Sequence, residues 1–126
     1  MLMYNYESFK YYIILLKSMK EESIFLEYMG DSPRMRILQY FIEGKDFDYS
    51  LTDLLNAGVS WGTINNLIPK IAELGIIVKT RKIGRATLYK INQNNLIVKQ
   101  LIGLYNKLLL ENINQLENKK VKVLAY

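Results

Sequence analysis

The chain has 126 residues, of which 50% are hydrophobic and 23% are charged, and its formal net charge is +5 at pH 7. This length and composition predict a single soluble domain with one hydrophobic core. The chain contains no cysteine and no histidine, which excludes disulfides, thiolate nucleophiles and histidine-based catalysis or metal binding. Since its carboxylates are also scattered along the chain, we expect no enzyme activity, no metal and no cofactor.

The positive charge is concentrated in one third of the chain. Residues 60–99 hold seven basic residues and one acidic residue, a net charge of +6, whereas the other 86 residues hold ten basic and eleven acidic residues, a net charge of −1. Such a concentration is typical of a protein with a polyanionic partner. The longest apolar run, 11–16, is far shorter than the roughly 18 residues that a membrane span needs. With no signal-peptide pattern either, we expect a cytoplasmic protein with no membrane partner.

The first segments in chain order are helical or ambiguous. The apolar spacing of residues 4–19 predicts a helix with a broad apolar face. Residues 24–30 are too short to assign to either a strand or a helical turn. Ser32 and Pro33 are typical of a helix start, as cap and first helical residue, and we expect this helix to end near Gly44.

Two capped helices come next. Ser50 and Asp53 form a capping box that starts a short helix, which Gly58 ends. Ser60 caps a third helix running to residue 73 or 74, and Gly75 ends it. One side of this third helix is apolar, with Ile64, Leu67, Ile68 and Ile71. The opposite side carries Trp61, Gly62, Asn65, Asn66, Pro69, Lys70 and Glu73.

The apolar period then changes from that of a helix to that of a strand. Residues 76–81 and 86–92 are strand-like and flank a turn at 82–85, where Gly84 permits a positive φ. Asn94 or Asn95 caps a long final helix over about 96–118. We therefore expect a mainly α protein with a two-stranded β wing: a winged helix-turn-helix with an added N-terminal helix and a long C-terminal helix.

Three segments also resemble a known family. They are 30–38 (GDSPRMRIL), 57–64 (AGVSWGTI), and 73–77 (ELGII) leading into 80–86 (TRKIGRA). In this order they are similar to the archaeal-type winged helix-turn-helix transcriptional regulators, relatives of the ArsR and MarR groups. The resemblance implies DNA binding through the third helix and the wing, usually by a homodimer. Pro69 departs from the expected pattern, since it removes a helical hydrogen bond and predicts a kink.

The candidate DNA-binding residues have different expected roles. Asn65 and Asn66 are the best candidates for base readout, because an asparagine amide can bond adenine in two places. Trp61 can either stack on a sugar or anchor the helix start, and Ser60 is a cap that can also bond a phosphate. Phosphate or minor-groove contacts are expected from the wing cations. The full set of candidates is Ser60, Trp61, Gly62, Thr63, Asn65, Asn66, Lys70, Lys79, Arg81, Lys82 and Arg85.

The sequence predicts three parts. Residues 1–23 form an aromatic helix for dimerisation or packing, 24–93 form the DNA-binding domain, and 94–126 form a dimerisation helix and tail. The final helix has an approximate heptad seam containing Asn112, a residue type that fixes register in paired helices; the seam residues are Val98, Ile102, Tyr105, Leu109 and Leu116. A homodimer is expected, the alternative being a monomer whose terminal helices fold back on it.

The function expected from these features is that of a sequence-specific double-stranded DNA-binding transcriptional regulator. Its recognition helix, at about 60–74, would enter the major groove, and its wing, at 76–92, would lie on the backbone or in the minor groove. The alternative is a winged-helix protein-interaction module in a transcription or replication assembly. A recognition face nearly free of acidic residues and next to a cationic wing favours DNA.

Overall fold

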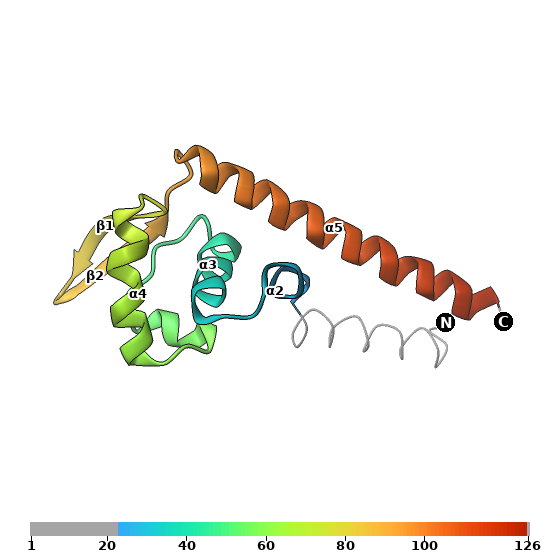
Figure 1. Ribbon diagram of the computed structural model, residues 1–126, viewed down its shortest axis with the longest axis horizontal. Helices are drawn as coiled ribbons and strands as arrows, with labels where there is room; N and C mark the ends of the chain where they lie inside the picture. Colours follow the sequence, from blue (N-terminus) through green and yellow to red (C-terminus); the bar gives the residue numbers. More distant parts are fainter. Residues whose placement is uncertain (1–22, 126) are drawn as a thin grey trace, which may run out of the picture.

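The computed structural model describes residues 23–125 (Figure 1), so the helix predicted at 4–19 lies outside the described part of the chain. The elements are α2 (Ile24–Met29), α3 (Pro33–Glu43), the 3-10 helix η1 (Asp53–Ala57), α4 (Trp61–Glu73), β1 (Ile77–Ile83), β2 (Ala86–Ile91) and α5 (Leu96–Ala125). The two strands form an antiparallel hairpin. This element order confirms the predicted fold class, a mainly α winged helix-turn-helix with a long C-terminal helix.

The ambiguous segment before the first predicted cap is helical. Ser23 caps α2 by accepting a hydrogen bond from the backbone N–H of Leu26 at 3.2 Å. The short helix buries Phe25 and ends at Gly30, whose φ is +89°. Since α2 is only six residues long, packing of Phe25 into the core stabilises it more than its own hydrogen bonds do.

The predicted start of α3 is confirmed. Ser32 accepts from the N–H of Met35 at 3.2 Å, and Pro33 occupies the first turn, where its missing N–H costs nothing. The helix ends at Gly44. It contributes four side chains to the hydrophobic core: Ile37, Leu38, Phe41 and Ile42.

The second helix is a 3-10 helix instead of the α-helix that the capping box suggested. The box itself is present, since the N–H of Ser50 donates to Asp53 Oδ2 at 2.9 Å and the N–H of Asp53 donates to Ser50 Oγ at 3.2 Å. Gly58 ends the element with a φ of +78°. A Cβ at Gly58 would also lie 2.6 Å from Arg36 Nη1. The positive φ at this turn therefore favours glycine, and a larger residue would also displace the end of the Arg36 side chain.

One core joins all the elements. It is formed by Phe25, Ile37, Leu38, Phe41, Ile42, Leu54, Val59, Ile64, Ile68, Ile71, Ile77, Ile91, Val98 and Leu108. Figure 1 shows α4 and the hairpin side by side at one end of the molecule, with α5 running away from them past α3 and α2. The core therefore holds α4 and the hairpin in a fixed relation at this end.

The long helix α5 begins at the predicted cap, because Asn95 Oδ1 accepts from the N–H of Ile97 at 2.8 Å and from that of Val98 at 3.3 Å. It continues to Ala125, seven residues beyond the expected end at Asn118. Val98 is buried in the core, and the ring of Tyr105 packs edge-on against Phe25 with centroids 5.5 Å apart. No helix between residues 23 and 125 has the length and hydropathy needed to cross a membrane.

Candidate nucleic-acid interface

The amino end of α4 is held by its cap. Ser60 Oγ accepts from the N–H of Thr63 at 3.4 Å, and the Ser60 hydroxyl donates to Thr63 Oγ1 at 2.9 Å. The apolar side of the helix packs inward through Ile64, Ile68 and Ile71, all of which are buried. This burial fixes which face of α4 points outward.

The outward face of α4 is the one that the sequence predicted. Every member of the predicted polar side is exposed: Trp61, Gly62, Asn65, Asn66, Pro69, Lys70 and Glu73. Trp61 retains 50% of its surface, so half of this large side chain is open to a partner. Glu73, at the far end, is the one acidic residue on a face that carries two neighbouring asparagines.

Pro69 does not divide α4. A single α-helix runs from Trp61 to Glu73 with Pro69 inside it, although proline cannot donate to the carbonyl of Asn65 four residues earlier. The Asn65 side chain turns back to its own helix, with Nδ2 donating to the carbonyl of Trp61 at 2.9 Å. Part of the hydrogen-bonding capacity of Asn65 is therefore used within the helix, whereas the neighbouring Asn66 is exposed.

The hairpin is regular at its base and tip. Its pairs run from Ile77↔Ile91 to Ile83↔Ala86, so β1 continues two residues beyond the predicted end at Arg81. Gly84 and Arg85 alone form the connecting loop, and the φ of Gly84 is +60°. Glycine at the first of two loop positions suits a tight hairpin turn, which places Arg85 at the tip of the wing.

A β-bulge interrupts the middle of the hairpin. Lys79 pairs with Tyr89 and Arg81 pairs with Leu88, so Thr80 is an extra residue in β1. Arg81 Nε donates to Asp48 Oδ2 at 2.9 Å, and Arg81 Nη2 lies 3.2 Å from Asp48 Oδ1. The Thr80 hydroxyl donates to the same carboxylate at 2.7 Å. Asp48 belongs to the loop between α3 and η1, and sequence reasoning gave it no role.

The same loop pairs with the outer edge of the hairpin. The N–H of Tyr49 donates to the carbonyl of Tyr89 at 2.7 Å, and the N–H of Tyr89 donates back at 2.8 Å. The Tyr49 ring also lies edge-on to Tyr40, with centroids 4.8 Å apart. The loop therefore supports the base of the wing on the side of β2.

The other three predicted DNA-binding cations of the wing are exposed and make no ion pair among the described residues. Lys79, Lys82 and Arg85 are exposed, and within residues 23–119 the ion pairs are Arg81 with Asp48 and Arg36 with Asp31. Of the four wing residues predicted to contact DNA, the structure thus leaves three open to a partner and holds Arg81 on a carboxylate of the same chain.

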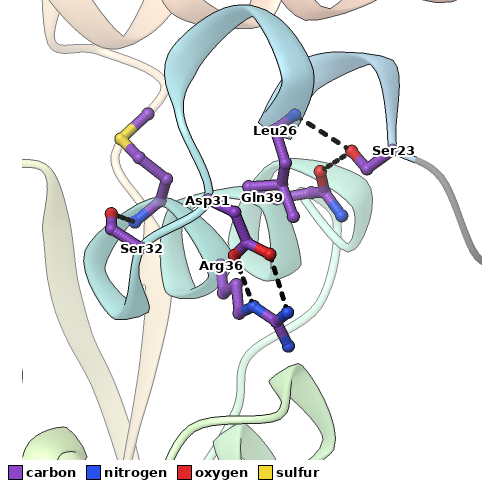
Figure 2. Close-up of polar contacts among 7 residues, drawn as sticks. Ser23, Leu26, Asp31, Ser32, Arg36 and Gln39 are labelled. Atoms are coloured by element: carbon purple, nitrogen blue, oxygen red, sulfur yellow. Dashed lines mark hydrogen bonds and ion pairs between the residues drawn. The ribbon is translucent and has the colours of Figure 1, made fainter.

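A second polar cluster lies between α2, α3 and the loop that connects them (Figure 2). Arg36 of α3 makes a two-pronged ion pair with Asp31, at 2.6 and 2.8 Å. The Ser23 hydroxyl, which caps α2, also donates to Gln39 Oε1. These contacts tie α2 and the connecting loop to α3. Arg36 is the same side chain that lies against Gly58, so the cluster reaches the turn before α4.

A polar contact also connects α3 to α5. Burial and the nearby Glu43 carboxylate raise the pKa of Tyr105 to about 12. Desolvation likewise raises the pKa of Glu43, although the nearby Gln39 and Tyr105 side chains oppose this shift. The described residues include no group of three or more acidic side chains arranged to hold a metal ion.

Comparison with protein-family models gave no match, and neither did comparison with curated proteins. Solved structures do match. The AntR antimony-specific transcriptional repressor is 20% identical, with a TM-score of 0.51, over 91% of this chain and 90% of that one. MepR, a transcription regulator of the Staphylococcus aureus multidrug efflux pump MepA, is 14% identical, with a TM-score of 0.54, over 95% of this chain and 93% of that one.

NadR, solved in complex with 4-hydroxyphenylacetate, is 14% identical, with a TM-score of 0.55, over 99% of this chain and 92% of that one. In each case the likeness covers nearly the whole of both chains. At these identities it concerns the arrangement of the backbone alone. The chain has the winged-helix fold found in transcription regulators.

Proposed function

We propose that this protein is a transcriptional regulator that binds double-stranded DNA in a sequence-specific manner. The observation that carries the proposal is the joint surface of α4 and the hairpin. A helix face with two exposed asparagines and an exposed tryptophan lies beside a hairpin with three exposed cations that make no ion pair among the described residues. A helix of this width fits the major groove, and a basic hairpin beside it suits the adjacent backbone.

Within this proposal the two elements do different work. Asn66, and Asn65 through its remaining hydrogen-bonding groups, would read base edges, while Ser60, Thr63 and Lys70 would contact phosphates near them. Gly62 would allow the backbone of α4 to approach the DNA closely, and Trp61 would pack on the sugar-phosphate backbone. Lys79, Lys82 and Arg85 would neutralise phosphates or enter the minor groove, which raises affinity for every sequence without distinguishing between them.

We also propose that the protein acts as a homodimer. Much of the predicted seam is covered within the chain, since Val98 and Leu116 are buried and Ile102 and Tyr105 pack on the core. Large apolar side chains elsewhere on α5 are nonetheless exposed: Leu96, Ile97, Leu104, Leu110 and Ile113. A second copy, covering these residues through the terminal helices, would place two α4 helices on successive turns of DNA.

Selection from random duplex DNA tests the proposal. We expect repeated rounds of binding and amplification with the full-length protein to enrich one motif with two related half-sites. Enrichment of no motif, together with equal binding to selected and unselected duplexes, would contradict sequence-specific recognition and favour the protein-interaction module instead.

A further inference from the structure

Arg81 differs from Lys79 and Lys82, the other two basic residues of β1, in the direction of its side chain. In an antiparallel pair, directly opposite residues lie on the same face of the sheet, and successive residues alternate between faces. Lys79 is opposite Tyr89, whereas Arg81 is opposite Leu88. Because Tyr89 and Leu88 are neighbours, Lys79 and Arg81 must lie on opposite faces of the hairpin.

The extra residue in β1 causes this difference. In a regular strand, residues two apart share a face, and Arg81 would then lie on the side of Lys79. The bulge at Thr80 shifts the register by one residue, and bulges re-aim side chains in this way. Lys82, opposite Thr87, returns to the face of Lys79. Arg81 is therefore the one cation of β1 that the bulge turns away from the other two.

The face shared by Lys79 and Lys82 is the one directed towards the core and α4. At the base of the hairpin it carries the buried pair Ile77 and Ile91, and Tyr89 packs against the core from the same face. A DNA duplex bound along α4 would therefore meet the side of the hairpin that carries Lys79 and Lys82. Arg81 lies on the other side.

On that other side, Asp48 occupies the hydrogen-bonding groups of Arg81. Tyr49 pairs with β2 while its neighbour Asp48 bonds to β1, so the Asp48 carboxylate reaches across β2. It accepts from both Thr80 and Arg81, at 2.7 and 2.9 Å. Its side chain is 17% exposed, against 62% for Arg81. The carboxylate is thus the sheltered partner of the pair.

We propose that Asp48 is a positioning residue of the wing, which holds Arg81 away from the DNA and fixes the angle of the bulged hairpin. Phosphate neutralisation then falls to Lys79, Lys82 and Arg85. This inference rests on the proposed DNA-binding function and revises the role that the sequence suggested for Arg81. The bulge allows two consecutive residues to bind one carboxylate, which a regular strand would not.

The salt dependence of binding to a labelled duplex distinguishes a phosphate contact from a positioning contact. Each neutralised phosphate contributes about 0.9 to the slope of log affinity against log salt concentration. We expect Arg85→Ala and Lys82→Ala to make the slope shallower by about that amount per protomer, and Arg81→Ala to leave it unchanged. Asp48→Asn should release Arg81 and steepen the slope, and adding Arg81→Ala to Asp48→Asn should restore the parental slope.

One result would contradict the role proposed for Arg81, and another would contradict DNA contact by the wing as a whole. If Arg81→Ala flattens the slope as much as Arg85→Ala does, Arg81 contacts phosphate and the inference is overturned. If neither Lys82→Ala nor Arg85→Ala alters the slope, the wing does not contact DNA and the proposed function fails first.

Amide hydrogen exchange without DNA then decides whether Asp48 positions the hairpin. We expect Asp48→Asn and Arg81→Ala each to speed exchange in the hairpin severalfold, with no further increase in the double variant, because both remove the same contact. Asp46→Asn, at an exposed position in the same loop, is the matched control. Unchanged hairpin exchange in both single variants would overturn the positioning role, whatever the result with DNA.

Discussion

Asp48 is the residue whose ionisation matters most to the geometry of the wing. Hydrogen bonds from Arg81 and Thr80 hold the pKa of Asp48 at about 2, compared with an ordinary value of 3.8. A carboxyl with a lower pKa in the folded protein adds stability above its unfolded pKa, and this contribution is lost as pH falls through the folded value. The contact with the hairpin is therefore fully formed at neutral pH.

This linkage predicts how an Asp48→Asn variant depends on pH. We expect the variant to have a lower Tm than the parent at neutral pH, and the gap to narrow as pH falls from 3.8 towards 2. Thermal unfolding of both proteins across this pH range provides the measurement, with Asp46→Asn as the control. A gap that stays constant down to pH 2 would show that the charge of Asp48 is not responsible.

Individual elements were predictable where local chemistry decides them. The caps Ser32, Ser60 and Asn95 each bond the backbone as expected, because capping involves residues two or three positions apart. The apolar stripe of α4 was predictable for the same reason, since helical periodicity alone defines its buried face. The end of α5 was not, because the sequence after Asn118 contains no glycine or proline to mark a stop.

Long-range contacts could not be predicted in this way. The pairing of Asp48 with Arg81 joins residues 33 positions apart. It also depends on the bulge at Thr80, and no glycine or proline in β1 indicates a bulge there. The sequence therefore identified Arg81 as a wing cation but not its partner. Similarly, whether Asn65 faces DNA or its own helix depends on a side-chain rotamer that periodicity cannot determine.

Pro69, which lies inside α4, allows a test of how much the missing helical hydrogen bond lowers the stability of the protein. We expect Pro69→Ala to raise the free energy of unfolding by up to about 3 kcal/mol, because alanine restores the N–H that bonds the carbonyl of Asn65 and has a higher helix propensity. Chemical denaturation measures this change. The exposed neighbour Lys70 provides the control, since Lys70→Ala should alter stability by less than about 0.5 kcal/mol. A loss of stability in Pro69→Ala would show that the ring makes a contact that outweighs the missing hydrogen bond.

In the whole molecule, α5 contributes side chains both to the hydrophobic core and to the exposed surface. Val98 and Leu108 belong to the core, so removing the helix would unfold the domain as well as any dimer. The exposed residues Leu110 and Ile113 are better sites for a test, because they retain 60% and 39% of their surface. Replacing them leaves the core intact.

We expect the double change Leu110→Glu and Ile113→Glu to convert a dimer into a folded monomer, because four carboxylates would then be brought together in the interface. Light scattering would show a halved particle mass with an unchanged circular dichroism spectrum. Gln115→Glu, which adds one charge at an exposed position of the same helix, is the control. Equal masses for the parent and the double variant would place the dimer contact elsewhere or show that the parent is a monomer.

If α4 reads the base sequence while the hairpin supplies positive charge, substitutions in the two elements should have different effects on DNA binding. Affinities of the parent, Asn66→Ala and Arg85→Ala are determined for a selected site and its single-base variants at two salt concentrations. Asn66→Ala should lose about 1–3 kcal/mol of discrimination at one base pair in each half-site and keep the parental salt dependence. Arg85→Ala should weaken binding to all variants alike and flatten the salt dependence by about one unit per protomer. If Asn66→Ala leaves base preference unchanged and Arg85→Ala leaves salt dependence unchanged, the account of this surface is contradicted.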